Sequence, residues 1–299
     1  MSHTRTAAVR RAFGRAAAGY DAHAFLQQEV ARRLAVHLDE IKLSPRRILD
    51  AGCGTGFAAP LLRARYPRAD LIGLDVAEGM AAEMRRRHGL LGWRWWLARL
   101  RPAAPSLSVI CGDMQQLPLA RGSVEMVWSS LSLQWVDLIP AFAECRRVLA
   151  PEGLLLFATL GPDTLKELRA ASTEIDGYTH VNRFVDMHDV GDALVRAGFA
   201  HPVMEMEHLT LTYPDLRGVL ADLKGIGGQT VLSGRRSGLM GKSAWTRLAA
   251  NYEAFRREDG RLPATYEVVY GHAWAAAPSQ VADGRQIMRF VPRGAGQGG

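Results

Sequence analysis

The chain has 299 residues, of which 48% are hydrophobic and 22% charged, a composition that excludes wholesale disorder and allows one large α/β domain with embellishments or two small domains. The sequence offers no stretch of about 18 uninterrupted apolar residues, which argues against a membrane span. A formal net charge of +7 indicates an acidic partner, and charge alone leaves nucleic acid, an anionic membrane and an acidic protein open.

Hydrophobic periodicity predicts a helical N-terminus over 6–40, which ends at Ser44-Pro45. The predicted strands are 47–50, 70–75, 107–111, 124–130, 153–160, 203–212 and 265–275. The predicted helices between them are 57–66, 77–88, 137–149 and 188–197, with a polar, glycine-rich helical stretch over 214–258. This alternation predicts a parallel sheet with helices on both faces.

Segment 89–105, "GLLGWRWWLARLRPAAP", combines aromatic and basic residues between the second predicted helix and the third predicted strand. Together with Arg85–Arg87 it holds six arginines and three tryptophans and no acidic residue. One interpretation is an amphipathic insertion whose tryptophans pack on the core. The other is a surface that contacts an anionic partner.

A glycine-rich turn, Asp50-Ala51-Gly52-Cys53-Gly54-Thr55-Gly56, follows the first predicted strand and precedes a helix. The glycines Gly52, Gly54 and Gly56 allow a sharp turn and a close approach of the backbone to a ligand. Asp50 can accept a hydrogen bond from the amine of a bound amino acid. The free N–H groups of the following helix can bind its carboxylate.

Two further acidic positions follow later strands. Asp75 ends the second predicted strand, where a carboxylate can accept hydrogen bonds from both ribose hydroxyls of a nucleoside. Asp113 follows the third strand in Gly112-Asp113-Met114, where it can accept from an adenine amino group while Met114 lies on the ring. A solvated strand end and a plain turn are the structural alternatives.

Together these three motifs resemble the class I S-adenosylmethionine methyltransferases. The glycine spacing GxGxG fits that family better than a dehydrogenase, and "RVLAPEG" (147–153) matches the turn before its fifth strand. The resemblance covers roughly 45–160. It implies an α/β fold with a Rossmann-like sheet, and S-adenosyl-L-methionine as the cofactor.

The nucleic-acid methyltransferases of this class carry signatures that this chain lacks. After the fourth predicted strand the sequence reads Trp128-Ser129-Ser130-Leu131-Ser132 in place of an Asn/Asp-Pro-Pro-aromatic run, and no Pro-Cys occurs. Both observations argue against a nucleic-acid substrate.

Six segments in order resemble the malonyl-acyl carrier protein O-methyltransferases of biotin synthesis. They are "AFGRAAAGYDAHAFLQ" (12–27), "SSLSLQWV" (129–136), "FATLGPDTLKEL" (157–168), "HVNRF" (180–184), "LKGIGG" (223–228) and "GRLPATYEVVYGHAWA" (260–275). The resemblance implies methyl-ester formation on the free carboxylate of malonyl-acyl carrier protein, or of malonyl-coenzyme A. An arginine-hydroxylating or non-catalytic assembly factor of respiratory complex I, which shares this family pattern, is the alternative.

The same resemblance implies a division of the chain. We expect an N-terminal helical lid (1–44), an S-adenosylmethionine-binding Rossmann-like domain (45–212) and a helical substrate-lid insertion (213–262). A final strand (263–277) and a disordered tail (278–299) complete it.

Methyl transfer to a carboxylate needs little acid–base chemistry, because a carboxylic acid with a reference pKa near 4 is ionised at pH 7. We therefore expect a clamp for the substrate carboxylate rather than a catalytic triad. The candidates are Tyr20, Asn182, Arg183 and Arg147. A packed aromatic is the alternative for Tyr20, a surface residue for Arg183 and a structural role for Arg147. Gln134 and Trp135 are expected on the substrate side.

The cysteines and histidines suggest no metal site. Cys53, Cys111 and Cys145 are widely spaced and odd in number, which favours the reducing cytoplasm over a disulfide framework. The histidines His180, His188 and His272 lack metal-ligand spacing.

Overall fold

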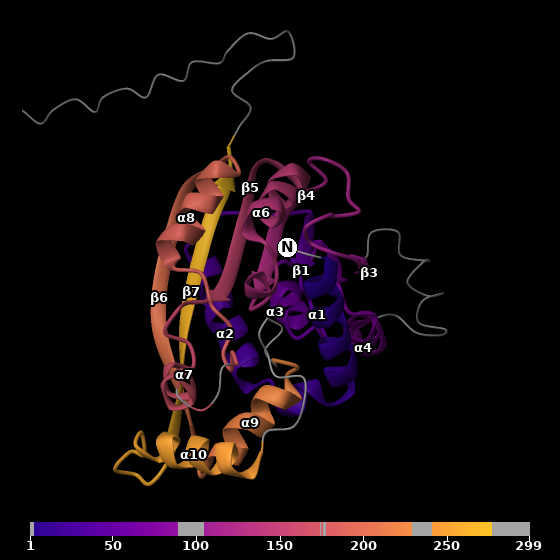
Figure 1. The fold of residues 1–299 in the computed structure, drawn as a ribbon. Helices are drawn as coiled ribbons and strands as arrows, with labels where there is room; N and C mark the ends of the chain where they lie inside the picture. The colour runs from indigo at the N-terminus through magenta and orange to yellow at the C-terminus, as the bar shows by residue number, and fades with distance from the viewer. Residues whose placement is uncertain (1–2, 89–104, 174, 176–177, 229–240, 277–299) are drawn as a thin grey trace, which may run out of the picture.

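The computed structural model of the protein describes residues 3–88, 105–173, 175, 178–228 and 241–276. These residues contain one seven-stranded sheet with the strand order β3-β2-β1-β4-β5-β7-β6 (Figure 1). The strands are β1 (Arg47–Ala51), β2 (Asp70–Asp75), β3 (Leu107–Cys111), β4 (Val124–Ser130), β5 (Leu149–Leu160), β6 (Phe199–Tyr213) and β7 (Leu262–Ala275). The predicted α/β fold with a Rossmann-like sheet is confirmed.

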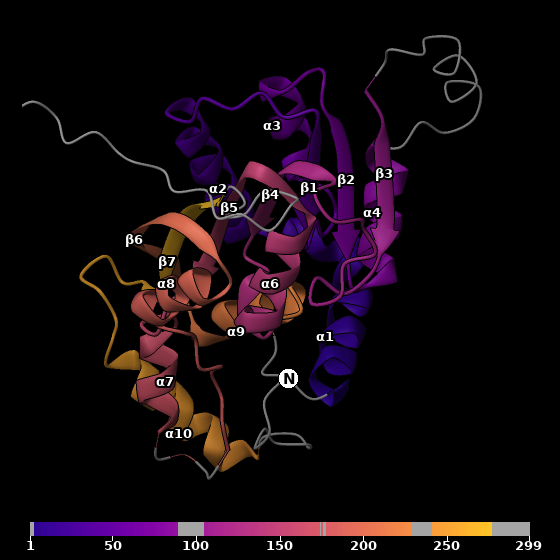
Figure 2. The same ribbon diagram turned by 90° about the horizontal axis from the view of Figure 1, so that it is seen from above.

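Helices cover both faces of this sheet, with α2 and α3 on one side and α6 and α8 on the other (Figure 2). The α-helices are α1 (His3–Ala16), α2 (Phe25–Val36), α3 (Ala58–Arg65), α4 (Glu78–His88), α6 (Leu138–Val148), α7 (Lys166–Ser172), α8 (Met187–Arg196), α9 (Leu216–Gly225) and α10 (Lys242–Glu253). Three short 3₁₀ segments are η1 (Ala17–Ala22), η2 (His37–Asp39) and η3 (Leu133–Trp135).

The sheet is mixed, which corrects the expectation of a parallel sheet. Strand β7 runs antiparallel to both β5 and β6, whereas the other neighbouring strands are parallel. Tyr213 at the end of β6 pairs with Leu262 at the start of β7. The chain therefore leaves β6 and enters β7 at the same end of the sheet. The connection through α9 and α10 consequently lies, with α7, at the carboxyl ends of the parallel strands (Figure 1).

The N-terminal segment is not the single helix that periodicity predicts over 6–40. It divides into α1, η1, α2 and η2, and the break falls at Ala17–Ala24. Glycine at position 19 weakens helix propensity there. The Asp21 carboxylate is then engaged by Thr55 and Arg87 from the sheet side, so tertiary contacts hold the break.

The bounds of several other elements differ from those that the sequence predicts. Strands β5, β6 and β7 are longer than predicted, and α7 was not predicted. The stretch 214–258 contains two helices, α9 and α10, with 229–240 outside the described residues. All of the Trp/Arg segment 89–105 except its last residue, and all of 277–299 with the expected disordered tail, also lie outside them.

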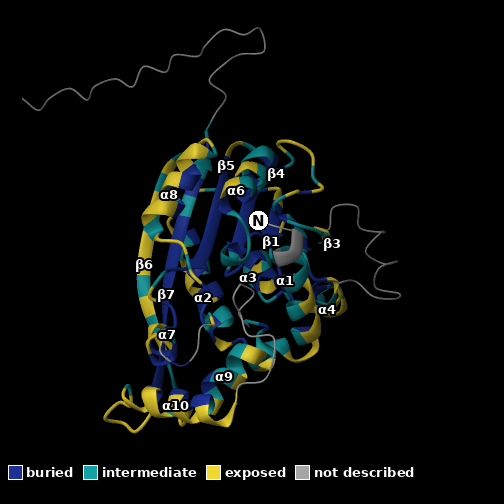
Figure 3. Cartoon of the chain, viewed as in Figure 1, coloured by how far each residue is buried: buried dark blue, intermediate teal, exposed yellow. Residues whose placement is uncertain are grey.

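The core follows the two faces of the sheet. Along β5 the side chains alternate, with Leu154 and Leu156 packing on the α2 side and Leu155 and Phe157 on the α6 side. Buried strands occupy the centre of the sheet, whereas β6 is an edge strand with exposed side chains (Figure 3). Among the described residues, none of the helices combines the length and apolar character that a bilayer crossing requires.

Candidate functional site

The glycine-rich turn lies where β1 ends, beside β4 and next to the end of β2. This is the edge of an open α/β sheet at which ligands bind. The N–H of Gly52 donates to the Leu74 carbonyl oxygen at 2.7 Å, and Gly52 has a φ of +82°. A Cβ at Gly52 would lie 2.3 Å from the Ser132 Cβ, so only glycine fits. A Cβ at Gly54 would meet nothing within 4 Å, which leaves space for a ligand beside that position.

Asp50 is a buried carboxyl with an unused oxygen. It is 2% exposed, and its Oδ2 has no hydrogen-bond partner among the described residues. Burial, and next the negative charge of Asp75, raise the pKa of Asp50 to about 8. A buried acceptor of this kind indicates a ligand that brings a donor, and an ammonium group would also restore the carboxylate charge.

Asp75 links the turn to the second strand. Its Oδ2 accepts the Gly54 N–H at 3.0 Å and its Oδ1 accepts the Ala77 N–H at 2.8 Å. Burial raises its pKa to about 6, and these two backbone donors oppose that rise. Asp75 therefore supports the glycine turn in addition to facing the cavity beside it.

Three cavities meet at this edge of the sheet. The turn cavity, of about 60 Å³, is lined by Asp50, Thr55 and the glycine turn. The strand-end cavity, of about 80 Å³, is lined by Asp75, Asp113 and Met114. The large cavity, of about 330 Å³, lies between the strand ends and α9. Tyr20 lines all three cavities, so it occupies their junction.

The first two cavities fit the two ends of S-adenosylmethionine. The turn cavity offers the unpaired Asp50 oxygen to an amino group, and the strand-end cavity offers Asp75 and Asp113 to a nucleoside. Asp113 is steadied by its own turn, because its Oδ1 accepts the Gln115 N–H at 2.9 Å. Met114 is buried and lines the same cavity. The structure thus brings together every cofactor residue that the sequence suggested except Gly56.

Gly56 packs against α4 instead. A Cβ there would lie 2.7 Å from the Met84 Cγ and 2.8 Å from the His88 Cδ2, and φ at Gly56 is +88°. Gly56 is not among the residues that line the three cavities. Its glycine is therefore required for helix packing rather than for room beside a ligand.

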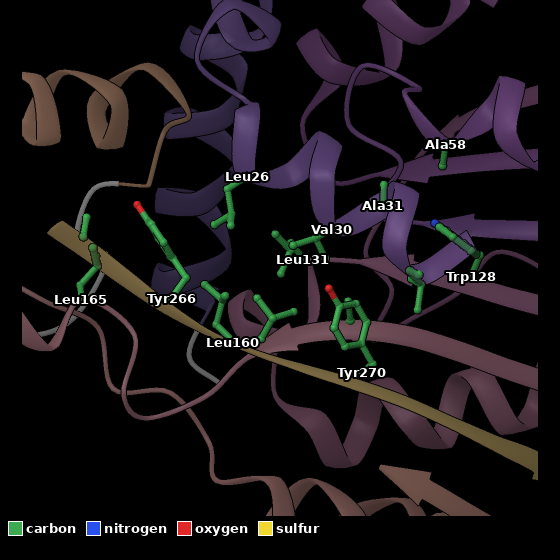
Figure 4. Packing of buried hydrophobic residues seen from close by; sticks show 14 of the residues in the cluster. Leu26, Val30, Ala31, Ala58, Trp128, Leu131, Leu160, Leu165, Tyr266 and Tyr270 are labelled. Atoms are coloured by element: carbon green, nitrogen blue, oxygen red, sulfur yellow. The ribbon is translucent and has the colours of Figure 1, made fainter. Parts of the chain in front are cut away.

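The large cavity has a mostly apolar wall. Leu26 from α2, Leu160 from β5 and Tyr266 from β7 converge on it (Figure 4). Its polar lining residues are Tyr20, Gln27, Gln134, Thr164, His180, Asn182, Lys224 and Tyr266. No Asp or Glu lines it among the described residues, and Lys224 is its single Lys or Arg. Such a wall suits a small anionic or neutral acyl group rather than a cation.

The N-terminal segment closes over the turn through Asp21. Its Oδ1 accepts the Thr55 hydroxyl at 2.6 Å, and its Oδ2 accepts from Arg87 of α4. Phe13 of α1 packs edge-on against Trp135, with ring centroids 5.3 Å apart. These contacts hold Tyr20 at the junction of the cavities.

The structure divides the four proposed clamp residues. Tyr20 and Asn182 line the large cavity. Arg183 is exposed and does not line it, although its neighbours Asn182 and Phe184 do. Arg147 is a structural residue, contrary to the clamp expectation. Its guanidinium donates to the Glu144 carboxylate and to the carbonyl oxygens of Leu119 and Leu117, which ties α6 to the connection between β3 and β4.

Sequence reasoning missed several residues of the site. Gln27, Lys224 and Tyr266 line the cavities, and Asp21 holds the N-terminal segment against the glycine turn. Gln27, Lys224 and Tyr266 all lie within the six segments that carried the family resemblance, as does Asp21. The segments therefore contained the signal, although no local spacing rule identified the individual side chains.

Among the described residues one group, Asp163, His208 and Glu267, could hold a metal ion by distance. The Glu267 Oε2 already accepts the Asp163 N–H at 2.6 Å, and the group lies outside the lining of the three cavities. Of the histidines considered from the sequence, His180 lines the large cavity, and burial lowers the pKa of His272.

Comparisons with known proteins agree with this geometry. A family model described as "Methyltransferase domain" matches residues 49–157. The YcgJ protein of Bacillus subtilis shares the fold, with a TM-score of 0.55 at 14% identity, covering 83% of this chain and 99% of that one. A protein of Bacillus halodurans C-125 gives a TM-score of 0.55 at 16% identity, covering 83% of this chain and all of the other.

Curated relatives match nearly the whole chain. A "Malonyl-[acyl-carrier protein] O-methyltransferase" of Gallionella capsiferriformans is 56% identical, over 94% of this chain and 95% of its own. Proteins with the same name are 55% identical in Laribacter hongkongensis, over 97% of both chains, and 39% identical in Legionella pneumophila, over 95% of both. Identity of this extent over nearly the whole chain shows that these proteins share one family. Together with the methyltransferase family model, it shows an S-adenosylmethionine-dependent O-methyltransferase. The chain belongs to the malonyl-[acyl-carrier protein] O-methyltransferase family.

Proposed function

We propose that this protein transfers the methyl group of S-adenosylmethionine to the free carboxylate of malonyl-acyl carrier protein and forms a methyl ester. One observation carries the proposal. The large cavity, which no acidic side chain lines among the described residues, meets both cofactor-side cavities at Tyr20. A carboxylate entering from that side reaches the place where the two ends of the cofactor join. The names of the relatives support the same substrate.

The cofactor would be held by groups at the strand ends. Asp50 would accept from its amino group, Asp75 from its ribose hydroxyls, and Asp113 from its adenine amino group. When bound, S-adenosylmethionine supplies an electrophilic methyl group on a sulfonium. Met114 would lie against the adenine ring, and the turn at Gly52 and Gly54 would bring the backbone close to the ligand.

Tyr20 is suited to orient the substrate. Burial, and next the charge of Asp75, raise the pKa of its phenol above the ordinary value, so the hydroxyl is neutral at physiological pH and can donate. The substrate carboxylate is already ionised and needs no base. A hydrogen bond from Tyr20 to one carboxylate oxygen leaves the other free to attack. The apolar wall at Leu131, Leu160 and Phe184 excludes competing water.

Methylation changes where the acyl group can be bound, because the methyl ester is uncharged. Methylation removes a charge whose burial in an apolar acyl tunnel is unfavourable, so the ester can be elongated as a disguised primer for biotin synthesis. No observation favours the complex I assembly-factor alternative, and the relatives are named as methyltransferases. We also propose a cytoplasmic location, which the three free cysteines support.

Mass spectrometry tests the reaction directly. The protein is incubated with malonyl-acyl carrier protein and S-adenosylmethionine, and the acyl group is expected to gain one methyl, on its carboxylate. Acetyl-acyl carrier protein, which has no free carboxylate, is the matched control and should stay unmodified. Absence of the ester at saturating cofactor would contradict the proposal.

The choice of carrier needs a second measurement. An acidic carrier docking on a chain of net charge +7 is steered electrostatically, and salt screens this over about 10 Å at 0.1 M. Turnover of malonyl-acyl carrier protein should therefore fall with salt more steeply than turnover of malonyl-coenzyme A. Equal salt slopes would argue against steering. The arginines of 89–105, which the sequence suggests for contact with an anionic partner, lie outside the described residues.

A further inference from the structure

Lys224 is the one basic residue, Lys or Arg, among the described residues that line the large cavity. It lies near the C-terminal end of α9, where the helix dipole favours a cation. The nearest acid on that helix, Asp222, is already engaged. Its Oδ1 lies 3.0 Å from the His23 Nδ1, and its carboxylate accepts the Tyr213 hydroxyl. Within the described part of the chain, no ion pair is recorded for Lys224.

A second observation places a ligand in the same cavity. Asn182 is 8% exposed and lines the cavity, yet its Oδ1 has no hydrogen-bond partner among the described residues. A buried acceptor without a donor is unfavourable unless a ligand supplies one. The pantetheine arm that carries an acyl thioester contains amide N–H groups, which are donors of this kind. The wall therefore offers an acceptor for the arm and a cation for the acyl group.

The position of α9 keeps Lys224 beside the N-terminal lid. A Cβ at Gly225 would lie 2.3 Å from the His23 Cγ, and one at Gly227 would lie 3.3 Å from the backbone of Ala12. The end of α9 is thus packed directly against the segment that carries Tyr20. The cavity of about 330 Å³ is at the small end of ligand sites. Tyr20 and Lys224 both line this cavity, so an acyl group bound in it shares the cavity with both side chains.

We propose that Lys224 binds the free carboxylate of the substrate and so selects the charged acyl group over its neutral methyl ester. This inference rests on the proposed function and adds to it the residue that recognises the substrate class. The substrate loses its negative charge as the methyl group is transferred. The attraction to Lys224 is therefore stronger for the bound substrate than for the transition state or the ester. Lys224 contributes to substrate affinity and lets the neutral product leave.

The test compares Lys224→Met with Lys224→Arg, which keeps the charge. Arg217→Met is the matched control, since Arg217 is an exposed cation on the same helix that does not line the cavity. The substrate is malonyl-pantetheine, which has neither a phosphate nor a carrier protein. Lys224→Met should raise KM about 10- to 100-fold, the range for loss of a hydrogen bond to a charged group. It should not lower kcat, because the lost attraction is weaker in the transition state than in the bound substrate. The melting temperature and inhibition by the methyl ester product should stay unchanged.

Lys224→Arg should restore most of the affinity, and Arg217→Met should behave as the unsubstituted protein. An unchanged KM in Lys224→Met overturns the proposal. So does an equal weakening of substrate and ester, which would indicate a structural role. A loss seen with malonyl-acyl carrier protein but absent with malonyl-pantetheine would assign Lys224 to carrier docking and also overturn it.

Calorimetry separates this inference from the proposed function. Binding of malonyl-pantetheine is measured in the presence of S-adenosylhomocysteine, which cannot donate a methyl group. If the unsubstituted protein binds the thioester in this experiment but forms no ester with S-adenosylmethionine, the proposed function fails. The ratio of the thioester dissociation constants of the unsubstituted protein and Lys224→Met then still decides the role of Lys224. Absence of binding to the unsubstituted protein overturns both.

Discussion

Replacing Asp50 by asparagine is expected to stabilise the cofactor-free protein, increasingly so as the pH rises. Burial raises the pKa of this carboxyl from 3.8 to about 8 in the folded protein. Between these values the unfolded chain has lost the proton and the folded chain keeps it. The free energy of unfolding therefore falls as the pH rises between these two pKa values. The destabilisation by Asp50 reaches its full size only above about pH 8, where the folded protein has also lost the proton.

The magnitude follows from the proton difference. One proton gives a slope of about 1.4 kcal/mol per pH unit, so Asp50 lowers the free energy of unfolding by about 3 kcal/mol between pH 5 and pH 7. Asparagine has nearly the same shape and does not titrate. Any fixed packing or hydrogen-bonding difference between the two side chains is the same at both pH values, so the change of the stability difference with pH isolates the ionisation.

Urea denaturation of the cofactor-free protein and of Asp50→Asn, across pH 5 to 8, measures this difference. The two stability curves should diverge as the pH rises. Asp50→Asn should also bind S-adenosylmethionine more weakly by calorimetry, because its amide cannot offer a negative charge to an amino group. Parallel stability curves would falsify the reasoning, since they would mean that Asp50 has the same pKa in the folded and unfolded chains.

The remaining predictions concern single contacts. Asp75→Ala should weaken S-adenosylmethionine binding by about 1–3 kcal/mol, because ribose hydroxyls lose their acceptor; an unchanged Kd in calorimetry would remove the ribose role. Tyr20→Phe should lower kcat/KM for malonyl-thioester about tenfold or more with little change in cofactor Kd, through loss of one donor to the carboxylate; wild-type kinetics would refute the orienting role. Arg147→Ala should lower the free energy of unfolding by about 1–3 kcal/mol while kinetics on folded enzyme stay normal; lost turnover at unchanged stability would return Arg147 to the active site.

The sequence by itself determined the sheet elements and the glycine turn. These are local properties: strand periodicity needs only neighbouring residues, and the positive φ at Gly52 and Gly54 is a conformation that glycine adopts readily. Asp50 and Asp75 could be placed because each sits at or next to the end of a predicted parallel strand. Parallel strands bring their carboxyl ends to one edge, so position along the chain was enough to predict a shared site.

Tertiary structure decided what depends on distant segments. The antiparallel direction of β7 follows from where α9 and α10 return the chain, which periodicity does not encode. The break near Asp21 depends on Thr55 and Arg87, partners far along the chain. Of the neighbours Asn182 and Arg183, the fold buries Asn182 against the cavity and leaves Arg183 exposed. Lys224 lines the large cavity because helix packing brings α9 against the N-terminal segment, a contact between segments about 200 residues apart in sequence.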